Sequence, residues 1–175
     1  MTIATERTVL RGFRESDYKD LHAYLSLPET YVFEPGNPVT IDEAKTLCLD
    51  RSKGKNFIAV CSKQDEKLMG HFSFFPVEPL YTRTYDIGFI FNPHYHGKGL
   101  ASESLKAFIS YCFSQLNVHR LQANCDPANE KSWKLLERTG FEREGELKSN
   151  IYFREKEGKP LWQNTYVYGL LNPEE

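Results

Sequence analysis

The clearest alternation of apolar and polar positions in the chain falls between Thr84 and Phe91. The odd-numbered residues from 85 to 91 are all large and apolar, whereas the even-numbered positions carry Asp86, Gly88 and Ile90. A period of two predicts a β-strand whose two faces meet different surroundings. Similar patterns and polar turns predict further strands at 6–11, 56–61, 68–75, 120–125, from 141, and at 162–171.

Elsewhere the spacing of apolar residues changes to that of a helix. The longest such stripe follows Lys98 and places five apolar side chains on one face: Leu105, Phe108, Ile109, Cys112 and Leu116. Shorter helices are predicted after Ser16–Tyr18, from the capping box Thr40–Glu43 to about Arg51, and over 129–138. Strands and helices mixed in this order predict an α/β domain with one central sheet.

The chain has 175 residues, which predicts a single domain over residues 1–175. Aromatic residues make up 14% and the net charge is −2, which argues against a disordered chain and against a nucleic-acid binder.

The four cysteines have no CxxC spacing, so we expect buried thiols. No signal peptide or membrane span is expected, and the predicted location is the cytoplasm.

A glycine-rich turn, His96 to Ser102, joins the alternating strand to the long helix. The first turn of a helix presents backbone N–H groups without internal partners, and glycines at 97 and 99 let a ligand approach them. This geometry favours a phosphate or pyrophosphate. The turn lacks the spacing of a dinucleotide-binding or Walker A motif, and the alternative is a tight strand-to-helix turn that binds no ligand.

The segment His96-Gly97-Lys98-Gly99-Leu100-Ala101 resembles motif A of the GCN5-related N-acetyltransferases (GNAT), written Gln/Arg-x-x-Gly-x-Gly/Ala, with His in place of Gln or Arg. The stretches 126–133 and 136–141 resemble the Asn-x-x-Ser…Gly-Phe block of the ribosomal-protein N-terminal acetyltransferase branch. Residues 6–11 loosely resemble that branch's opening. The resemblance covers essentially the whole chain and implies the GNAT fold, a mostly antiparallel sheet with helices on both faces.

The resemblance also implies acetyl-CoA as the acetyl donor. Its pyrophosphate would bind the turn, and its pantetheine arm would lie along the end of a strand that splays from its neighbour. The residues implied in donor binding are Phe89, Ile90, Phe91, His96, Gly97, Lys98, Gly99, Leu100, Ala101, Ser102, Asn129 and Ser132. A backbone N–H near Ile90 or Phe91 would stabilise the oxyanion. No metal is expected, because two histidines at i and i+2 are weak evidence for one.

Acetyl transfer to an amine needs a base, and we nominate Asp86. It lies on the polar face of its strand, where its position resembles the carboxylate used by some GNAT enzymes. The alternatives are Glu34, Glu103 and His71, and Asp86 could equally be a solvated or paired aspartate. Glu103 could simply favour the helix N-terminus, and His71 could be structural.

A second catalytic group should assist the leaving thiolate. Many GNAT enzymes use a tyrosine seven residues after the helix-opening asparagine, but that position is Leu136 here. The branch resemblance instead points to Ser132 as the acid or hydrogen-bond donor and to Asn129 as a pantetheine contact. Alternatively, Asn129 is a helix N-cap and Ser132 an ordinary residue of the first turn.

The acceptor should bind between the first helices and the last strands. The proposed lining residues are Tyr31, Phe33, Glu34, Tyr152 and Trp162, whereas Phe57 and Phe108 are assigned to packing. This lining suits a protein N-terminus or a small hydrophobic amine. The predicted function is therefore N-acetylation of a primary amine by direct transfer, in a monomer or homodimer, with no nucleic-acid or membrane partner. The alternatives are a non-catalytic CoA-binding module and, more distantly, a protein–protein adaptor.

Overall fold

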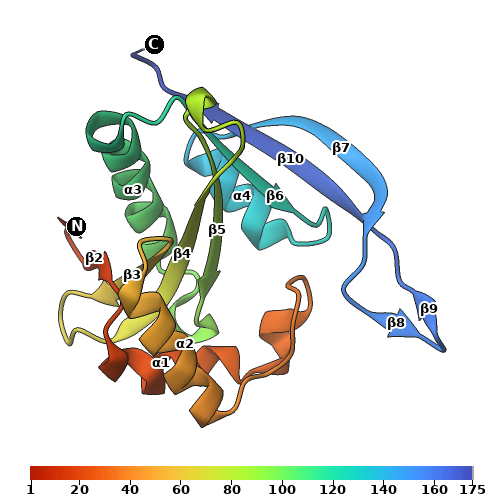
Figure 1. Cartoon of the computed structure of the whole chain (residues 1–175), viewed down its shortest axis with the longest axis horizontal. Coiled ribbons are helices and arrows are strands. Elements are labelled where there is room, and N and C mark those ends of the chain that lie inside the picture. Colours follow the sequence, from red (N-terminus) through yellow and green to blue (C-terminus); the bar gives the residue numbers. More distant parts are fainter. Residues whose placement is uncertain (175) are drawn as a thin grey trace.

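A computed structural model of the protein describes residues 1–174 and centres on an eight-stranded sheet (Figure 1). The strand order is β1-β2-β3-β4-β5-β6-β10-β7, and every neighbouring pair is antiparallel except β5 and β6. The bounds are β1 Thr2–Ala4, β2 Thr8–Gly12, β3 Phe57–Ser62, β4 Leu68–Pro76, β5 Thr84–Phe91, β6 Arg120–Cys125, β7 Glu142–Ile151 and β10 Gln163–Leu171. A separate two-stranded ribbon pairs β8 (Glu155–Lys156) with β9 (Lys159–Pro160) at the end of a projecting arm (Figure 1).

Helices cover both faces of the sheet and create two apolar cores. On one face pack α3 (Leu100–Leu116) and α4 (Glu130–Arg138), with Phe108 and Leu136 fully buried. On the other face pack α1 (Tyr18–Leu25) and α2 (Ile41–Lys53). This arrangement confirms the expected mixed α/β class, a mostly antiparallel sheet with helices on both faces.

Strand β5 contributes to both cores because its side chains alternate as the sequence predicts. Ile87 and Phe89 belong to the α3 side, and Ile90 packs on the α1 and α2 side. Four one-turn 3₁₀ segments complete the chain, at Glu15–Asp17, Pro28–Tyr31, Leu80–Thr82 and Pro93–Tyr95.

The pairing between β5 and β6 stops early and leaves a gap in the sheet. Only three residue pairs form, from Thr84 with Arg120 to Asp86 with Gln122, although both strands continue beyond them. The sheet is therefore continuous at one end of β5 and divided at the other. The divided end is where the expected splayed strand should lie.

Local sequence signals account for most element ends. Thr40 and Glu43 form the predicted capping box at the start of α2, and Asn129 caps α4 by accepting a hydrogen bond from the Ser132 N–H. Gly99, with φ of +76°, precedes α3 in a left-handed conformation that glycine adopts readily. The sequence did not predict β1, β8, β9 or the 3₁₀ segments, because each is only two to four residues long.

Two further expectations concern thiols and membrane segments. All four cysteines are free and buried, which confirms the thiol prediction. Among residues 1–174 no helix has the length and apolar character needed to cross a membrane.

Candidate active site

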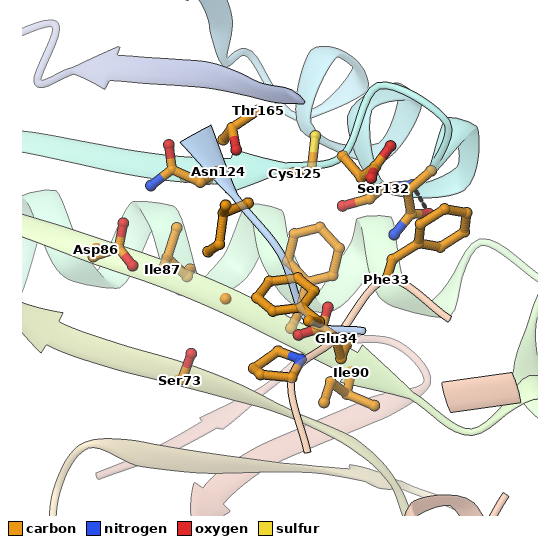
Figure 2. A pocket seen from close by; sticks show the side chains of 18 of the residues that line it. Phe33, Glu34, Ser73, Asp86, Ile87, Ile90, Asn124, Cys125, Ser132 and Thr165 are labelled. Carbon is orange, nitrogen blue, oxygen red and sulfur yellow. Dashed lines mark hydrogen bonds between the residues drawn. The ribbon is translucent and has the colours of Figure 1, made fainter. Parts of the chain in front are cut away.

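A cavity of about 530 Å³ opens where β5 and β6 separate. Its walls come from the loop after Tyr31, the ends of β3 to β6, the start of α4 and the β7 and β10 arm (Figure 2). The polar groups at its wall include Glu34, Arg51, Asp86 and Ser132. Chemically reactive side chains from distant parts of the sequence therefore meet in one pocket.

Asp86 lies at the narrow end, in the last residue pair before the strands diverge. Burial raises the pKa of its carboxyl group, while a hydrogen bond with Gln122 acts in the opposite direction. The Oδ1 atom is buried and has no hydrogen-bond partner within residues 1–174. Such an atom is costly to bury unless water or a ligand reaches it.

Glu34 is another of the carboxylates in the pocket and comes from the loop between α1 and α2. Burial raises its pKa to about 7. In Figure 2, Glu34 lies toward the Ile90 end of the pocket, and Asp86 lies at the opposite end. A carboxyl group with this pKa exchanges its proton readily at neutral pH.

Ser132 faces the pocket from the first turn of α4 and lies near the end of β6. Its hydroxyl group hydrogen-bonds with the thiol of Cys125, whose pKa burial raises to about 11. Asn129 also lines the pocket while its side chain caps the helix. The capping alternative is thus correct for Asn129, and it leaves the residue at the pocket wall. Figure 2 places Ser132 far from Asp86.

The glycine-rich turn lies outside the pocket lining and is held by the N-terminal segment. Arg7 donates to the Lys98 carbonyl at 2.9 Å and forms an ion pair with Glu103 at 2.7 Å. Glu103 also accepts from the Thr5 hydroxyl and the Arg7 backbone N–H, and its pKa is lowered by these bonds although burial opposes the shift. Glu103 is therefore engaged in structural contacts, and it lies outside the pocket lining.

The open face of the turn fits the expected anion site. A Cβ atom added at Gly97 would meet no heavy atom within 4 Å, and this residue has φ of +74°. His96, the residue that departs from the motif, donates from Nε2 to the Phe91 carbonyl at 3.0 Å. Its side chain thus ties the turn back to the end of β5.

The structure brings together only part of the proposed acceptor lining. Phe33 and Glu34 line the pocket, but Tyr31, Tyr152 and Trp162 do not. Tyr31 is buried and its hydroxyl donates to the Leu25 carbonyl at 2.8 Å. Tyr152 and Trp162 stack edge to face on the exposed arm, with ring centroids 5.1 Å apart.

Two lining residues, Arg51 and Phe57, have roles that the sequence did not reveal, and a third, His71, has the structural contacts of one of its two predicted roles. Phe57, assigned to packing alone, contributes to the core and also lines the pocket together with Arg51 and His71. His71 is buried and hydrogen-bonds to the Tyr24 hydroxyl at 2.7 Å, and its pKa is lowered well below the ordinary value by burial and by Arg51. Their spacing of 6 to 20 residues carries no local signal. Pairing of β3 with β4 brings Phe57 near His71, and the end of α2 places Arg51 against both.

Comparison with known proteins identifies the family. Residues 7–142 match the model of the acetyltransferase (GNAT) domain. The chain belongs to the GNAT acetyltransferases. An uncharacterised N-acetyltransferase of Bacillus subtilis, YnaD, is 32% identical, with 99% of each chain covered. A GNAT acetyltransferase structure from Bacillus anthracis is 31% identical, with a TM-score of 0.90 over the whole of both chains.

More distant GNAT relatives differ in the acceptors that their names state. The ribosomal protein uS5-alanine N-acetyltransferase of Escherichia coli is 34% identical over 50% of this chain and 43% of its own. A Vibrio cholerae spermidine N-acetyltransferase structure with CoA and spermine shares the fold, with 22% identity, a TM-score of 0.77 and coverage of 94% and 95%. The protein is an N-acetyltransferase of a family that uses acetyl-CoA. Within residues 1–174 no group of three His, Cys, Asp or Glu is arranged to hold a metal ion.

Proposed function

We propose that this GNAT protein transfers the acetyl group of acetyl-CoA directly to a primary amine, on a protein N-terminus or a small molecule. The observation that carries the proposal is the cavity at the divergence of β5 and β6, which holds two carboxyl groups of raised pKa and a serine. The donor would bind with its pyrophosphate on the Gly97–Ser102 turn and its pantetheine arm along residues 89–91. The amine would enter from the side of Glu34.

The position of Asp86 along β5 decides which carboxyl group can take the proton from the amine. Asp86 precedes Ile90 by four residues, which corresponds to roughly 13 Å at the rise of a strand. An acetyl group held near Ile90 would be too far from Asp86 for direct proton transfer, which needs hydrogen-bond contact or one water. We assign the direct step to Glu34 and give Asp86 the ordering of water at the narrow end.

Direct transfer forms one amide bond and breaks one thioester bond. The amine nitrogen attacks the thioester carbon, a backbone N–H near Ile90 stabilises the oxyanion, and Glu34 takes the amine proton. The carbon–sulfur bond breaks as the amide forms. Ser132 donates a hydrogen bond to the departing CoA thiolate, which takes its proton from solvent. For this role the Cys125 thiol, which its raised pKa keeps protonated, must donate to the Ser132 oxygen, so that the single O–H of Ser132 is left for the CoA sulfur.

A binding and turnover experiment tests the proposal. Acetyl-CoA should raise the melting temperature of the protein. With acetyl-CoA and at least one member of a panel of amines and N-terminal peptides, the protein should release CoA as a free thiol. Ser132→Ala should slow thiol release and leave the acetyl-CoA shift in place. The absence of a melting shift at millimolar acetyl-CoA, or of thiol release throughout the panel, contradicts the proposal.

A further inference from the structure

Arg51 is a cation at the pocket wall for which the protein supplies no anion. It lies in the last turn of α2, and it is the only Lys or Arg among the described residues that line the cavity. Within residues 1–174 its guanidinium group forms no ion pair, and its one hydrogen-bond contact is to His71 Nε2 at 3.5 Å. A guanidinium group has five N–H donors, so most of them remain for a ligand.

Aromatic rings hold this guanidinium group in place. Its central carbon lies 4.2 Å from the ring centroid of Phe57 and 5.3 Å from that of Phe13. Burial lowers the pKa of Arg51, although it stays far above neutrality as arginine does. The two phenylalanine rings that pack against the Arg51 side chain fix the orientation of its planar guanidinium group and exclude water from it. This strengthens the attraction of the group for an anion.

His71 cannot act as the missing anion. An arginine only donates, so His71 Nε2 accepts and its Nδ1–H faces the Tyr24 oxygen at 2.7 Å. This pattern fits a neutral imidazole. The hydrogen bonds that link Tyr24, His71 and Arg51 therefore orient the cation and leave its charge uncompensated.

The pocket carboxylates do not pair with Arg51 either. Asp126 accepts from Gln163 and from the Ala128 N–H, both at 2.7 Å. The raised pKa of Glu34 has burial as its only cause, and the cationic group does not offset it. A partly buried cation without a partner is costly, and a site that tolerates one is suited to an anionic ligand.

We propose that the acceptor amine also carries a carboxylate and that Arg51 binds this carboxylate in a bidentate pair. This inference rests on the proposed function, whose acceptor it narrows to amino acids or to peptides with a carboxylate near the amine. The amine would then lie toward Glu34 and the carboxylate toward Arg51, since both side chains line the cavity. Polyamines, which are cations without a carboxylate, would be disfavoured by Arg51.

Matched acceptors test the assignment. We would compare the common α-amino acids with their carboxamides, and include dipeptides and spermidine, using both acetyl transfer and calorimetric binding to the CoA complex. The carboxylate forms should be preferred by tenfold or more in kcat/KM or in Kd. Preference for free amino acids or for dipeptides distinguishes the two sources of the carboxylate.

Variants of α2 separate the specific role from a general effect of charge. Arg51→Gln should bring the ratio of carboxylate to carboxamide use, measured within the same variant, to within about twofold of one, whereas Lys53→Gln, an exposed cation in the same helix turn, should leave this ratio as in the wild type. Arg51-dependent carboxylate binding without turnover would support the inference and contradict the proposed transfer. Equal use of carboxamides, a preference for spermidine, or an unchanged preference in Arg51→Gln would overturn the inference and leave the transfer standing.

Discussion

Glu34 is the residue whose environment most directly controls the proposed chemistry. Its raised pKa, about 7, means that the carboxylate form appears only as the pH rises through neutrality. We therefore expect kcat/KM to increase with pH and to level off above a midpoint near 7. Glu34→Gln should lower kcat/KM by roughly a hundredfold or more and remove this rise.

Asp86→Asn is the matched control for that measurement, since Asp86 lines the same pocket. It should reduce kcat less than Glu34→Gln does and leave the pH midpoint unchanged. If the pH dependence disappears in Asp86→Asn and survives in Glu34→Gln, then Asp86 is the base and the assignment to Glu34 is wrong.

The same carboxyl group predicts a pH-dependent effect on stability. Its folded pKa, about 7, is above its ordinary value of 4.5, so the folded state holds the proton more tightly than the unfolded state. The protonated carboxyl group makes its full contribution to the free energy of unfolding below pH 4.5. This contribution is lost as the pH rises through 7. Glu34→Gln should therefore gain melting temperature relative to wild type at pH 8 but not at pH 4.5. A constant difference across this range would mean that burial does not raise the Glu34 pKa.

At the scale of elements, the end of β5 is fixed by a close approach between strands. A Cβ atom added at Gly70 of β4 would lie 2.6 Å from the Ile90 carbonyl oxygen. Gly70→Ala should displace the strand end that is expected to hold the acetyl group. We predict a loss of about 1–3 kcal/mol in the free energy of unfolding, measured with urea, together with a lower kcat.

Gly145→Ala provides the control, because a Cβ there meets nothing within 4 Å. It should leave kcat unchanged. If Gly70→Ala matches Gly145→Ala in both stability and kcat, the close approach has no importance for the site.

The turn before α3 depends on a second element, the segment between β1 and β2. Arg7 joins the Lys98 carbonyl to Glu103. Arg7→Ala should release the turn and raise the Kd for acetyl-CoA several-fold, as measured by calorimetry. Lys106→Ala, an exposed cation on α3, should have no comparable effect. Equal Kd values for wild type and Arg7→Ala would show that the turn keeps its shape without this clamp.

Most elements could be predicted from sequence because their signals are local. The alternation of β5, the capping box of α2 and the apolar stripe of α3 each lie within one segment. The pocket depends on contacts between segments, so its lining was predicted only in part, from the motif residues and from Phe33 and Glu34 in the loop after Tyr31. Arg51 and Phe57 belong to no motif and were not predicted at the pocket, and Tyr31 was misplaced because its hydroxyl turns inward to Leu25.

At the scale of the whole molecule, the pocket joins segments that are far apart in the sequence. Arg154, in the arm after β7, donates to the Tyr31 carbonyl at 2.8 Å in the loop that carries Glu34. Arg154→Ala should loosen this closure and raise the KM for the amine while the acetyl-CoA Kd stays constant. Lys156→Ala, an exposed residue of β8, serves as the control. An unchanged amine KM in Arg154→Ala would show that the bridge does not shape the acceptor site.

The central claim is that this pocket transfers the acetyl group itself to a bound amine. The most direct measurement quantifies, in one reaction, the N-acetylated amine by mass spectrometry and the free CoA by its thiol. We predict equal amounts of the two products with the wild-type protein, and a parallel loss of both in Glu34→Gln. Free CoA without acetylated amine would identify hydrolysis instead, and it would contradict the account.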